Sequence, residues 1–262
     1  MQNQQHLKVV IVKGEKRHPG QRTQKDIENI LRNVHKGLAH HPDILLLPEY
    51  ALYGGKPELQ DNNPAVRKIL EWSKQHPQTL IIPGTYIKKE GEALYNRTAV
   101  IKGGKILQYH DKQHSSGFDR DMGGQHGLPF SSRYTNPVVE HEEAGLTVGI
   151  ETCIDHCPEE KPGVLRKHLE ETGREPVDIH CITAHQVDHT LENIMAKDQG
   201  YLVTADSFQD AGYKSSVHRV NRTKQGWDML EEVKPDKETT DILVYRLPVK
   251  VQKVPHRERK AL

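Results

Sequence analysis

The sequence predicts an α/β protein in which β-sheets pack face to face and helices cover their outer surfaces. Segments near both ends of the chain alternate between short apolar runs and longer amphipathic stretches, as strands followed by helices do. The middle of the chain instead contains paired β-hairpin patterns. No internal repeat or linker interrupts the 262 residues, so we expect a single domain over residues 1–262.

The first part of the chain contains two strand patterns and two helix patterns. Leu7–Val12 is a short apolar run that predicts a buried strand, and Thr23–His40 places apolar residues at helical spacing. Asp43–Pro48 is too short for a helix and ends at a proline, which favours a second buried strand. Pro64–His76 predicts a second helix, because proline is acceptable in a first turn.

Strand patterns dominate the middle of the chain. Gly103-Gly104 is a strong hairpin signal, because both turn positions can take positive φ. The stretch from Gln113 to Arg133 is rich in Gly, Ser, Asp and His and predicts a long functional loop. Strands are expected at Thr79–Ile82, Tyr95–Lys102, Ile106–His110, Val138–His141 and Leu146–Ile150.

The last part of the chain predicts further alternation and a basic tail. Helices are expected at Pro158–Glu171 and Leu191–Gln199, and strands at Val177–Ile182, Tyr201–Ala205 and Asp241–Leu247. From about residue 250 the chain becomes basic, and we expect this terminus to be solvated.

Composition excludes several classes of protein. Hydrophobic residues make up 34% of the chain, and no apolar run approaches the roughly 20 residues that span a bilayer. A net charge of +1 predicts neither nucleic-acid nor membrane partners. The first residues lack the pattern of a secretory signal, and three cysteines favour a reducing compartment over a disulfide framework. We therefore expect a cytoplasmic protein.

One cysteine follows a predicted strand, in Val148-Gly-Ile-Glu-Thr-Cys153-Ile-Asp-His-Cys-Pro158. The proline can open a helix, so the Cys153 thiol would lie where backbone N–H groups and the helix dipole favour a thiolate. Such a position can lower a cysteine pKa from about 8.5 to between roughly 3.5 and 7.5. Taken alone, the motif fits a buried structural cysteine slightly better.

Two charged residues also follow predicted strands. Glu49 comes directly after a buried apolar run, where desolvation raises a carboxyl pKa and suits the group to act as a general base. Lys112 follows the hairpin, where its ammonium could hold an oxyanion or stabilise a thiolate. At about 4 Å and an effective dielectric near 20, an ion pair is worth roughly 4 kcal/mol, close to three pKa units. Each residue alone also fits an ordinary surface side chain.

The ordered set of motifs resembles the nitrilase or carbon–nitrogen hydrolase superfamily. It consists of an acid after a strand and proline, a lysine after a hairpin, and a cysteine in Gly-x-x-x-Cys-x-Asp. The resemblance runs from about Lys8 to Asp206 and includes Tyr95-Asn96 and Gly103-Gly104. It implies a four-layer α-β-β-α sandwich that pairs through its surface into a homodimer or larger homo-oligomer.

The resemblance also implies an amidase-type Glu-Lys-Cys triad. Glu49 would be the general base, Lys112 the oxyanion stabiliser and Cys153 the nucleophile. We expect hydrolysis of a non-peptide carbon–nitrogen bond in a small amide or N-carbamoyl-type substrate, through a cysteine thioester. Nitriles and acyl transfer to an amine suit the same machinery. One carboxylate acts as base and acid in turn, so no metal or organic cofactor is expected.

The chain departs from the family pattern after Lys112. The family usually places a second glutamate in the following loop, and no glutamate is present there. Asp119 and Asp121 are candidate second acids, and Asp119 is preferred because Phe118 could anchor the loop and turn its neighbour inward. The candidate pocket residues are Tyr50, Ile154 and His185.

Two other functions stay open at this point. The missing glutamate is consistent with a catalytically inactive nitrilase-fold protein that binds a partner. Clusters of Cys and His suggest a metalloprotein, although a strand at Val177–Ile182 would prevent the second cluster from sharing a helix face. The two clusters are Cys153, His156 and Cys157, and then Cys181, His185 and His189.

Overall fold

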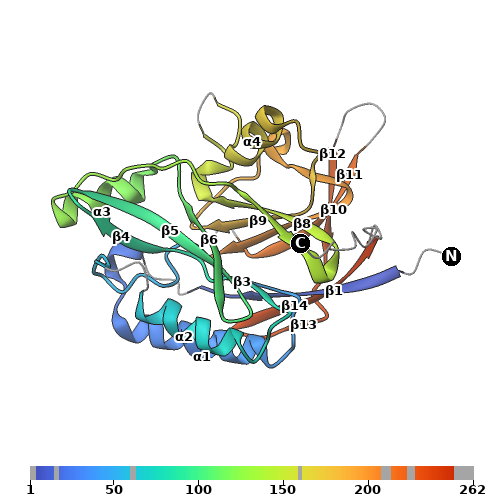
Figure 1. The fold of residues 1–262 in the computed structure, drawn as a ribbon, viewed down its shortest axis with the longest axis horizontal. Coiled ribbons are helices and arrows are strands. Elements are labelled where there is room, and N and C mark those ends of the chain that lie inside the picture. The colour runs from blue at the N-terminus through green and yellow to red at the C-terminus, as the bar shows by residue number, and fades with distance from the viewer. Residues whose placement is uncertain are drawn as a thin grey trace, which may run out of the picture.

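The fold consists of two β-sheets that face each other, with helices on their outer sides (Figure 1). The computed structural model describes residues 4–14, 18–59, 63–158, 161–207, 214–222 and 228–250. The predicted basic tail from about residue 250 lies outside the described residues, apart from its first position. Each helix in the described part of the chain is too short or too polar to cross a bilayer.

The first sheet has eight strands in the order β13-β14-β1-β2-β3-β5-β4, with β6 paired to β5. The pairs β1–β2 and β2–β3 are parallel, and the other pairs of this sheet are antiparallel. The strands are β1 (Gln4–Val12), β2 (Ile44–Leu46), β3 (Leu80–Ile82), β4 (Tyr86–Glu90), β5 (Ala93–Lys102), β6 (Lys105–Asp111), β13 (Lys237–Glu238) and β14 (Ile242–Lys250).

The second sheet has six strands in the order β12-β11-β10-β9-β8-β7. Its central strands β8, β9 and β10 are parallel, and antiparallel strands flank them on both sides. The strands are β7 (Val138–His141), β8 (Leu146–Thr152), β9 (Val177–Ala184), β10 (Ala196–Asp206), β11 (Ser216–Arg222) and β12 (Asp228–Val233).

The helices begin at recognisable caps. The side chains of Thr23 and Asp26 form a capping box at the first helix, and Asn63 caps the second through two backbone N–H groups. The α-helices are α1 (Gln24–Leu38), α2 (Pro64–Ser73), α3 (Gly117–His126) and α4 (Val164–Thr172). Single 3-10 turns occur at Pro19–Gln21, Glu142–Ala144, Cys153–Asp155 and Leu191–Asn193.

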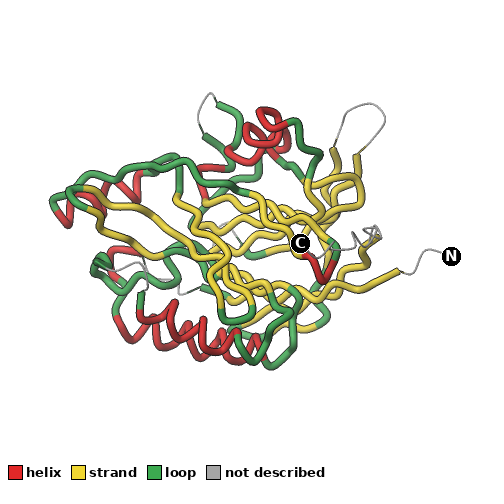
Figure 2. The backbone as a smooth tube through the Cα atoms, in the orientation of Figure 1, coloured by secondary structure: helices red, strands yellow, loops and turns green. Residues whose placement is uncertain are grey.

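Three apolar clusters hold these layers together. The largest lies between the sheets and joins residues such as Ile11 and Leu46 to Val148 and Ile179. A second packs α1 and α2 against the outer face of the first sheet. A third packs α4 against the second sheet through Leu165 and neighbouring residues. Figure 2 shows the resulting order, with strands in the interior and helices at the margins.

Several predicted elements differ from the observed ones. The predicted loop from Gln113 to Arg133 contains α3, and the predicted helix Pro158–Glu171 begins only at Val164. The predicted helix Leu191–Gln199 is wrong, because this segment turns once and then enters β10, which pairs with β9. Strands β11, β12 and β13 were not expected from the sequence. Pairing with distant strands outweighs local helix propensity in such segments.

Candidate active site

Three predicted functional residues follow three strands that end near one another. Glu49 comes three residues after β2, Lys112 directly after β6 and Cys153 directly after β8. The backbone N–H of Glu49 donates to the carbonyl of Ala184 at the end of β9, which joins the two sheets at this point. All three functional side chains are buried.

Lys112 lies between two carboxylates. Its Nζ is 2.7 Å from Oε1 of Glu49 and 2.7 Å from Oδ2 of Asp119. Burial alone would lower the pKa of Lys112, but Asp119 and Glu49 raise it well above its usual value. The ammonium therefore stays charged throughout the physiological pH range.

Glu49 keeps one carboxylate oxygen available. Burial raises the pKa of Glu49 to about 7, while the charge of Lys112 opposes that rise. Its Oε2 makes no hydrogen bond of normal geometry to a described residue, whereas the carboxylate does interact with the Cys153 thiol. A carboxyl group with this pKa can accept and return a proton near neutral pH.

The Cys153 thiol lies at a sharp bend between β8 and a 3-10 turn. Its backbone has a positive φ of 51°, and its Sγ donates to the carbonyl of His185 at 3.6 Å. Burial raises the pKa of Cys153 well above its usual value, and the negative charge of Glu49 raises it further. The expected thiolate is therefore wrong, because Lys112 does not outweigh these two effects. Pro158 also opens no helix at this point.

The two candidate second acids occupy different positions on α3. Asp119 is buried, and its contact with Lys112 lowers its pKa although burial opposes that change. Ser116 and Asp119 form a capping box that directs the Asp119 carboxylate inward. Asp121 is exposed and lines the adjacent pocket. Asp119 is therefore the acid that pairs with Lys112.

Two further side chains hold the carboxylates in place. Nδ2 of Asn96, on β5, donates to Oε1 of Glu49 at 2.8 Å and to Oδ1 of Asp119 at 3.0 Å. The hydroxyl of Tyr50 donates to the same Asp119 oxygen at 2.6 Å. Tyr50 was expected in the substrate pocket, but its side chain is fully buried and does not line the pocket. The Tyr95-Asn96 motif was the sequence signal that pointed to this strand.

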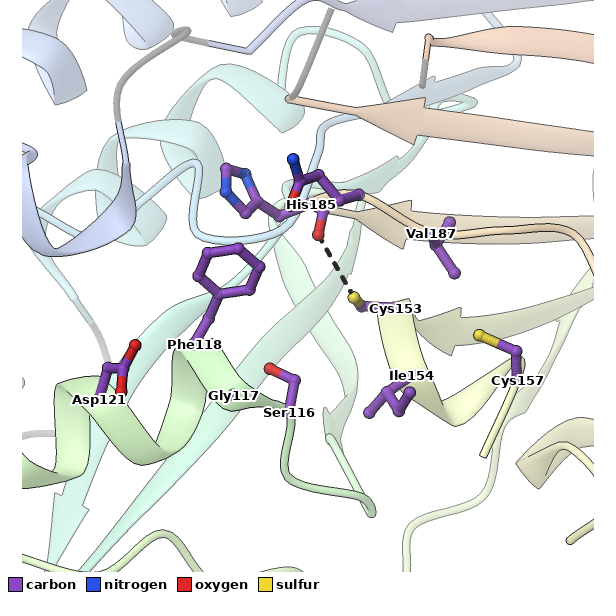
Figure 3. A pocket seen from close by; sticks show the side chains of 10 residues that line it. Ser116, Gly117, Phe118, Asp121, Cys153, Ile154, Cys157, His185 and Val187 are labelled. Carbon is purple, nitrogen blue, oxygen red and sulfur yellow. Dashed lines mark hydrogen bonds between the residues drawn. The ribbon is translucent and has the colours of Figure 1, made fainter. Parts of the chain in front are cut away.

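A pocket of about 290 Å³ opens beside Cys153 (Figure 3). Ile154 and His185 line it, as expected. Burial lowers the pKa of His185 to about 3, with help from the charge of Arg22, so the imidazole is neutral. Its Nδ1 is 2.5 Å from Oγ of Ser207. The other lining residues are Ser116, Gly117, Phe118, Asp121, Cys157, Gln186 and Val187.

A buried group of Glu151, His156 and His180 is the arrangement among the described residues that could hold a metal ion. The carboxylate contacts Nδ1 of His156 and Nε2 of His180, each at 2.9 Å. Backbone N–H groups donate to the other nitrogen of each ring, so the nitrogens that face Glu151 carry hydrogens. These nitrogens are therefore donors to the carboxylate, and the group does not fit a metal ion.

The Cys and His clusters expected from the sequence do not form metal sites either. Both ring nitrogens of His156 have hydrogen-bond partners, Glu151 and the backbone N–H of Thr190. Cys181 lies in the apolar core between the sheets. His189 is hydrogen-bonded to Thr204, at 2.9 Å. His156, Cys181 and His189 therefore each contact a different part of the protein and do not meet at one metal position.

Comparison with known proteins identifies the fold. No family model and no curated protein sequence matches the chain. A carbon–nitrogen hydrolase superfamily protein of Xanthomonas campestris, with an arsenic adduct in its active site, has a TM-score of 0.55 and 16% identity. An amidase of Nesterenkonia sp. AN1, with acrylamide added to its active-site cysteine, has a TM-score of 0.59 and 13% identity. Each match covers 93% of this chain. The matches cover 91% of the Xanthomonas protein and 94% of the amidase.

A third similar structure is part of a longer protein. It is a glutamine-dependent NAD⁺ synthetase of Acinetobacter baumannii, with a TM-score of 0.58 and 14% identity. The match covers 96% of this chain but 48% of the synthetase, so the chain spans about half the length of that protein. These likenesses confirm the predicted α/β fold of the nitrilase superfamily.

Proposed function

We propose that this protein hydrolyses a non-peptide carbon–nitrogen bond in a small amide or N-carbamoyl-type substrate. The observation that carries this proposal is the arrangement of Lys112 between Glu49 and Asp119, behind a cysteine that opens onto a pocket. An amidase with a similar fold also has a cysteine in its active site. The proposal is therefore supported by both geometry and fold.

Acylation begins from a neutral thiol. Glu49 accepts the proton of Cys153 as the sulfur attacks the substrate carbonyl, which forms a carbon–sulfur bond and a tetrahedral oxyanion. The protonated Glu49 then gives its proton to the substrate nitrogen. The carbon–nitrogen bond breaks, ammonia or an amine leaves, and a thioester on Cys153 remains.

Deacylation uses the same carboxylate again. Glu49 accepts a proton from a water molecule as the water oxygen attacks the thioester carbonyl. The carbon–sulfur bond breaks, and the proton on Glu49 returns to the Cys153 sulfur. The products are a carboxylic or carbamic acid and the original thiol, so the proposed reaction consumes only the substrate and one water molecule.

The positive charge of Lys112 supports both tetrahedral intermediates. It stays charged because two carboxylates flank it, and it lies beside the sulfur where the oxyanion forms. The backbone N–H of Ile154, in the first turn after Cys153, is the second donor that we assign to the oxyanion. Loss of one such donor typically lowers kcat by roughly 10²–10³-fold.

A panel of small amides tests the proposal. Ammonia release should be abolished in Cys153→Ala, while Cys157→Ala and Cys181→Ala should both release ammonia. Intact-protein mass spectrometry during turnover should show an acyl adduct that Cys153→Ala does not form. Circular dichroism establishes that each variant is folded. Wild-type turnover in folded Cys153→Ala, or no turnover of any amide by the wild-type protein, would contradict the proposal.

A further inference from the structure

The pocket beside Cys153 contains one carboxylate that the proposed reaction does not use. Asp121 lies on α3, a short distance along the helix from Ser116 and Phe118, which line the same pocket. Figure 3 shows Asp121 at the end of the pocket opposite Cys157, with Phe118 between Asp121 and His185. The Asp121 side chain is exposed and has no ion pair or hydrogen bond to any described residue.

Two cations of the described part of the chain that lie near this pocket, Lys112 and Arg22, are bound to other groups. Lys112 lies between Glu49 and Asp119, and Nη1 of Arg22 donates to the carbonyl of Tyr50 at 2.5 Å. Arg120, next to Asp121 on α3, is directed to the carbonyl of Ser115. No Lys or Arg among the described residues lines the pocket, so none of them balances the charge of Asp121 there.

The histidine that lines the pocket adds no positive charge at neutral pH. His185 is uncharged at neutral pH, and its ring packs edge-on against Phe118 with ring centroids 4.7 Å apart. At the Cys157 end of the pocket, burial raises the pKa of Cys157, and the carboxylate of Asp188 also raises it. Asp121 and, beside Cys157, Asp188 therefore supply negative charge near the opening, whereas the positive charges of Arg22 and Lys112 act on His185.

The walls between Cys153 and Asp121 are largely apolar. Phe118, Ile154 and Val187 supply them, and the volume of about 290 Å³ is small. A short aliphatic chain fits such walls, and Ser116 and Gln186 are the uncharged polar side chains that line the same pocket. Apolar walls that lead to a carboxylate fit a ligand with an aliphatic chain that ends in a hydrogen-bond donor.

We propose that Asp121 selects substrates whose non-reacting end is a primary ammonium or guanidinium group on a short aliphatic chain. This inference rests on the proposed function and adds to it the class of substrate. The amide carbon lies against Cys153, the chain lies along the apolar walls, and the cation pairs with Asp121. Substrates that end in a carboxylate are disfavoured by the same charge.

Three amides of matched length test this selection by kcat/KM. They are δ-aminovaleramide, which ends in an ammonium, hexanamide, which ends in a methyl group, and glutaramic acid, which ends in a carboxylate. We expect δ-aminovaleramide to exceed hexanamide by roughly fivefold, since the pair stays partly hydrated, and glutaramic acid to be the poorest substrate. The preference should weaken at high salt.

Asp121→Asn and Asp121→Lys measure the contribution of the carboxylate. The first should abolish the preference for the cation, and the second should reverse it toward glutaramic acid. Asp236→Asn is the matched control, because Asp236 is an exposed carboxylate outside the pocket. This control should keep the ratio of δ-aminovaleramide to hexanamide at the wild-type value.

Binding to folded Cys153→Ala tests the same selection without turnover. Ligand-observed NMR should show tighter binding of δ-aminovaleramide than of hexanamide, and Asp121→Asn in the same background should remove the difference. Equal ratios with and without the Asp121 carboxylate, in binding and in kcat/KM, would show that the inference is wrong. Absence of turnover alone contradicts the proposed hydrolysis, while the binding ratio still decides the role of Asp121.

Discussion

The carboxylate of Asp155 accepts the backbone N–H of Gln113 at 3.0 Å. This bond joins the residue after Lys112 to the 3-10 turn that begins at Cys153. The same carboxylate accepts the N–H of His114 at 2.8 Å, and the Asp155 side chain is fully buried. Asp155 therefore fixes the end of β6, which precedes Lys112, relative to the end of β8, which precedes Cys153.

Asp155→Asn should lower kcat by about tenfold or more, because it removes the charge that strengthens these bonds and replaces Oδ2, which also accepts from Gln113, with a buried NH2 donor. Leaving a buried donor unpaired also destabilises a protein by about 1–3 kcal/mol. The control is Asp178→Asn, since the Asp178 carboxylate accepts the N–H of Thr147 at 2.8 Å on a different part of β8. Thermal unfolding and kcat should both be measured. Equal losses of kcat in two variants of equal stability would contradict a positioning role for Asp155.

The pKa of Glu49 predicts the pH dependence of turnover. Glu49 must be ionised to accept the thiol proton, and burial raises its pKa to about 7. Because the active form is the deprotonated one, kcat/KM should rise with pH and level off above about 7, falling tenfold per unit well below it. Glu49→Gln should slow turnover strongly and remove this acid limb. A flat pH profile for hexanamide across neutral pH would remove Glu49 from the reaction.

Asp119→Asn should move the acid limb to lower pH. The charge of Asp119 raises the pKa of Glu49, so its removal lets Lys112 lower that pKa further. Lys112 also loses a partner that keeps it charged, so kcat should fall by roughly 10²-fold. The midpoint should not move in Asp121→Asn, whatever happens to substrate affinity, because Asp121 contacts neither Lys112 nor Glu49. An unshifted midpoint in Asp119→Asn would show that Asp119 does not set the pKa of Glu49.

The positions of Glu49 and Cys153 could be predicted because each follows a short apolar run, and that of Lys112 because it follows a hairpin. Buried parallel strands leave a clear signal of this kind, and their ends meet at one edge of the sheets. Helix α3 was missed because a Gly-rich composition hides its start. The Ser116 and Asp119 capping box was the local signal that marks it.

Other features depend on contacts that the local sequence does not contain. Asn96 reaches Glu49 across 47 residues, and nothing near Asn96 in the sequence marks that contact. The burial that raises the pKa of Cys153 comes from segments such as His185, which lies 32 residues away. The wrong helix at Leu191–Gln199 has the same origin, because pairing with β9 determines its structure.

His189 gives the folded protein a stability that depends on pH. Its Nε2 is 2.9 Å from Oγ1 of Thr204, and its ring lies between those of His156 and His218. Burial, together with the charge of His156, lowers the pKa of His189 to about 3. The folded protein therefore keeps this imidazole neutral at a pH where an unfolded chain, with a histidine pKa of about 6.5, binds a proton.

His189→Gln should make the free energy of unfolding less dependent on pH. The contribution of His189 is fully present above about pH 6.5 and is lost as the pH falls toward 3, at about 1.4 kcal/mol per pH unit. Glutamine can keep a hydrogen bond to Thr204 but cannot take up the proton. Urea unfolding between about pH 7 and 4 measures the slope. His6→Gln, at an exposed position of β1, should keep the wild-type slope, and an unchanged slope in His189→Gln would show that this histidine is not the group responsible.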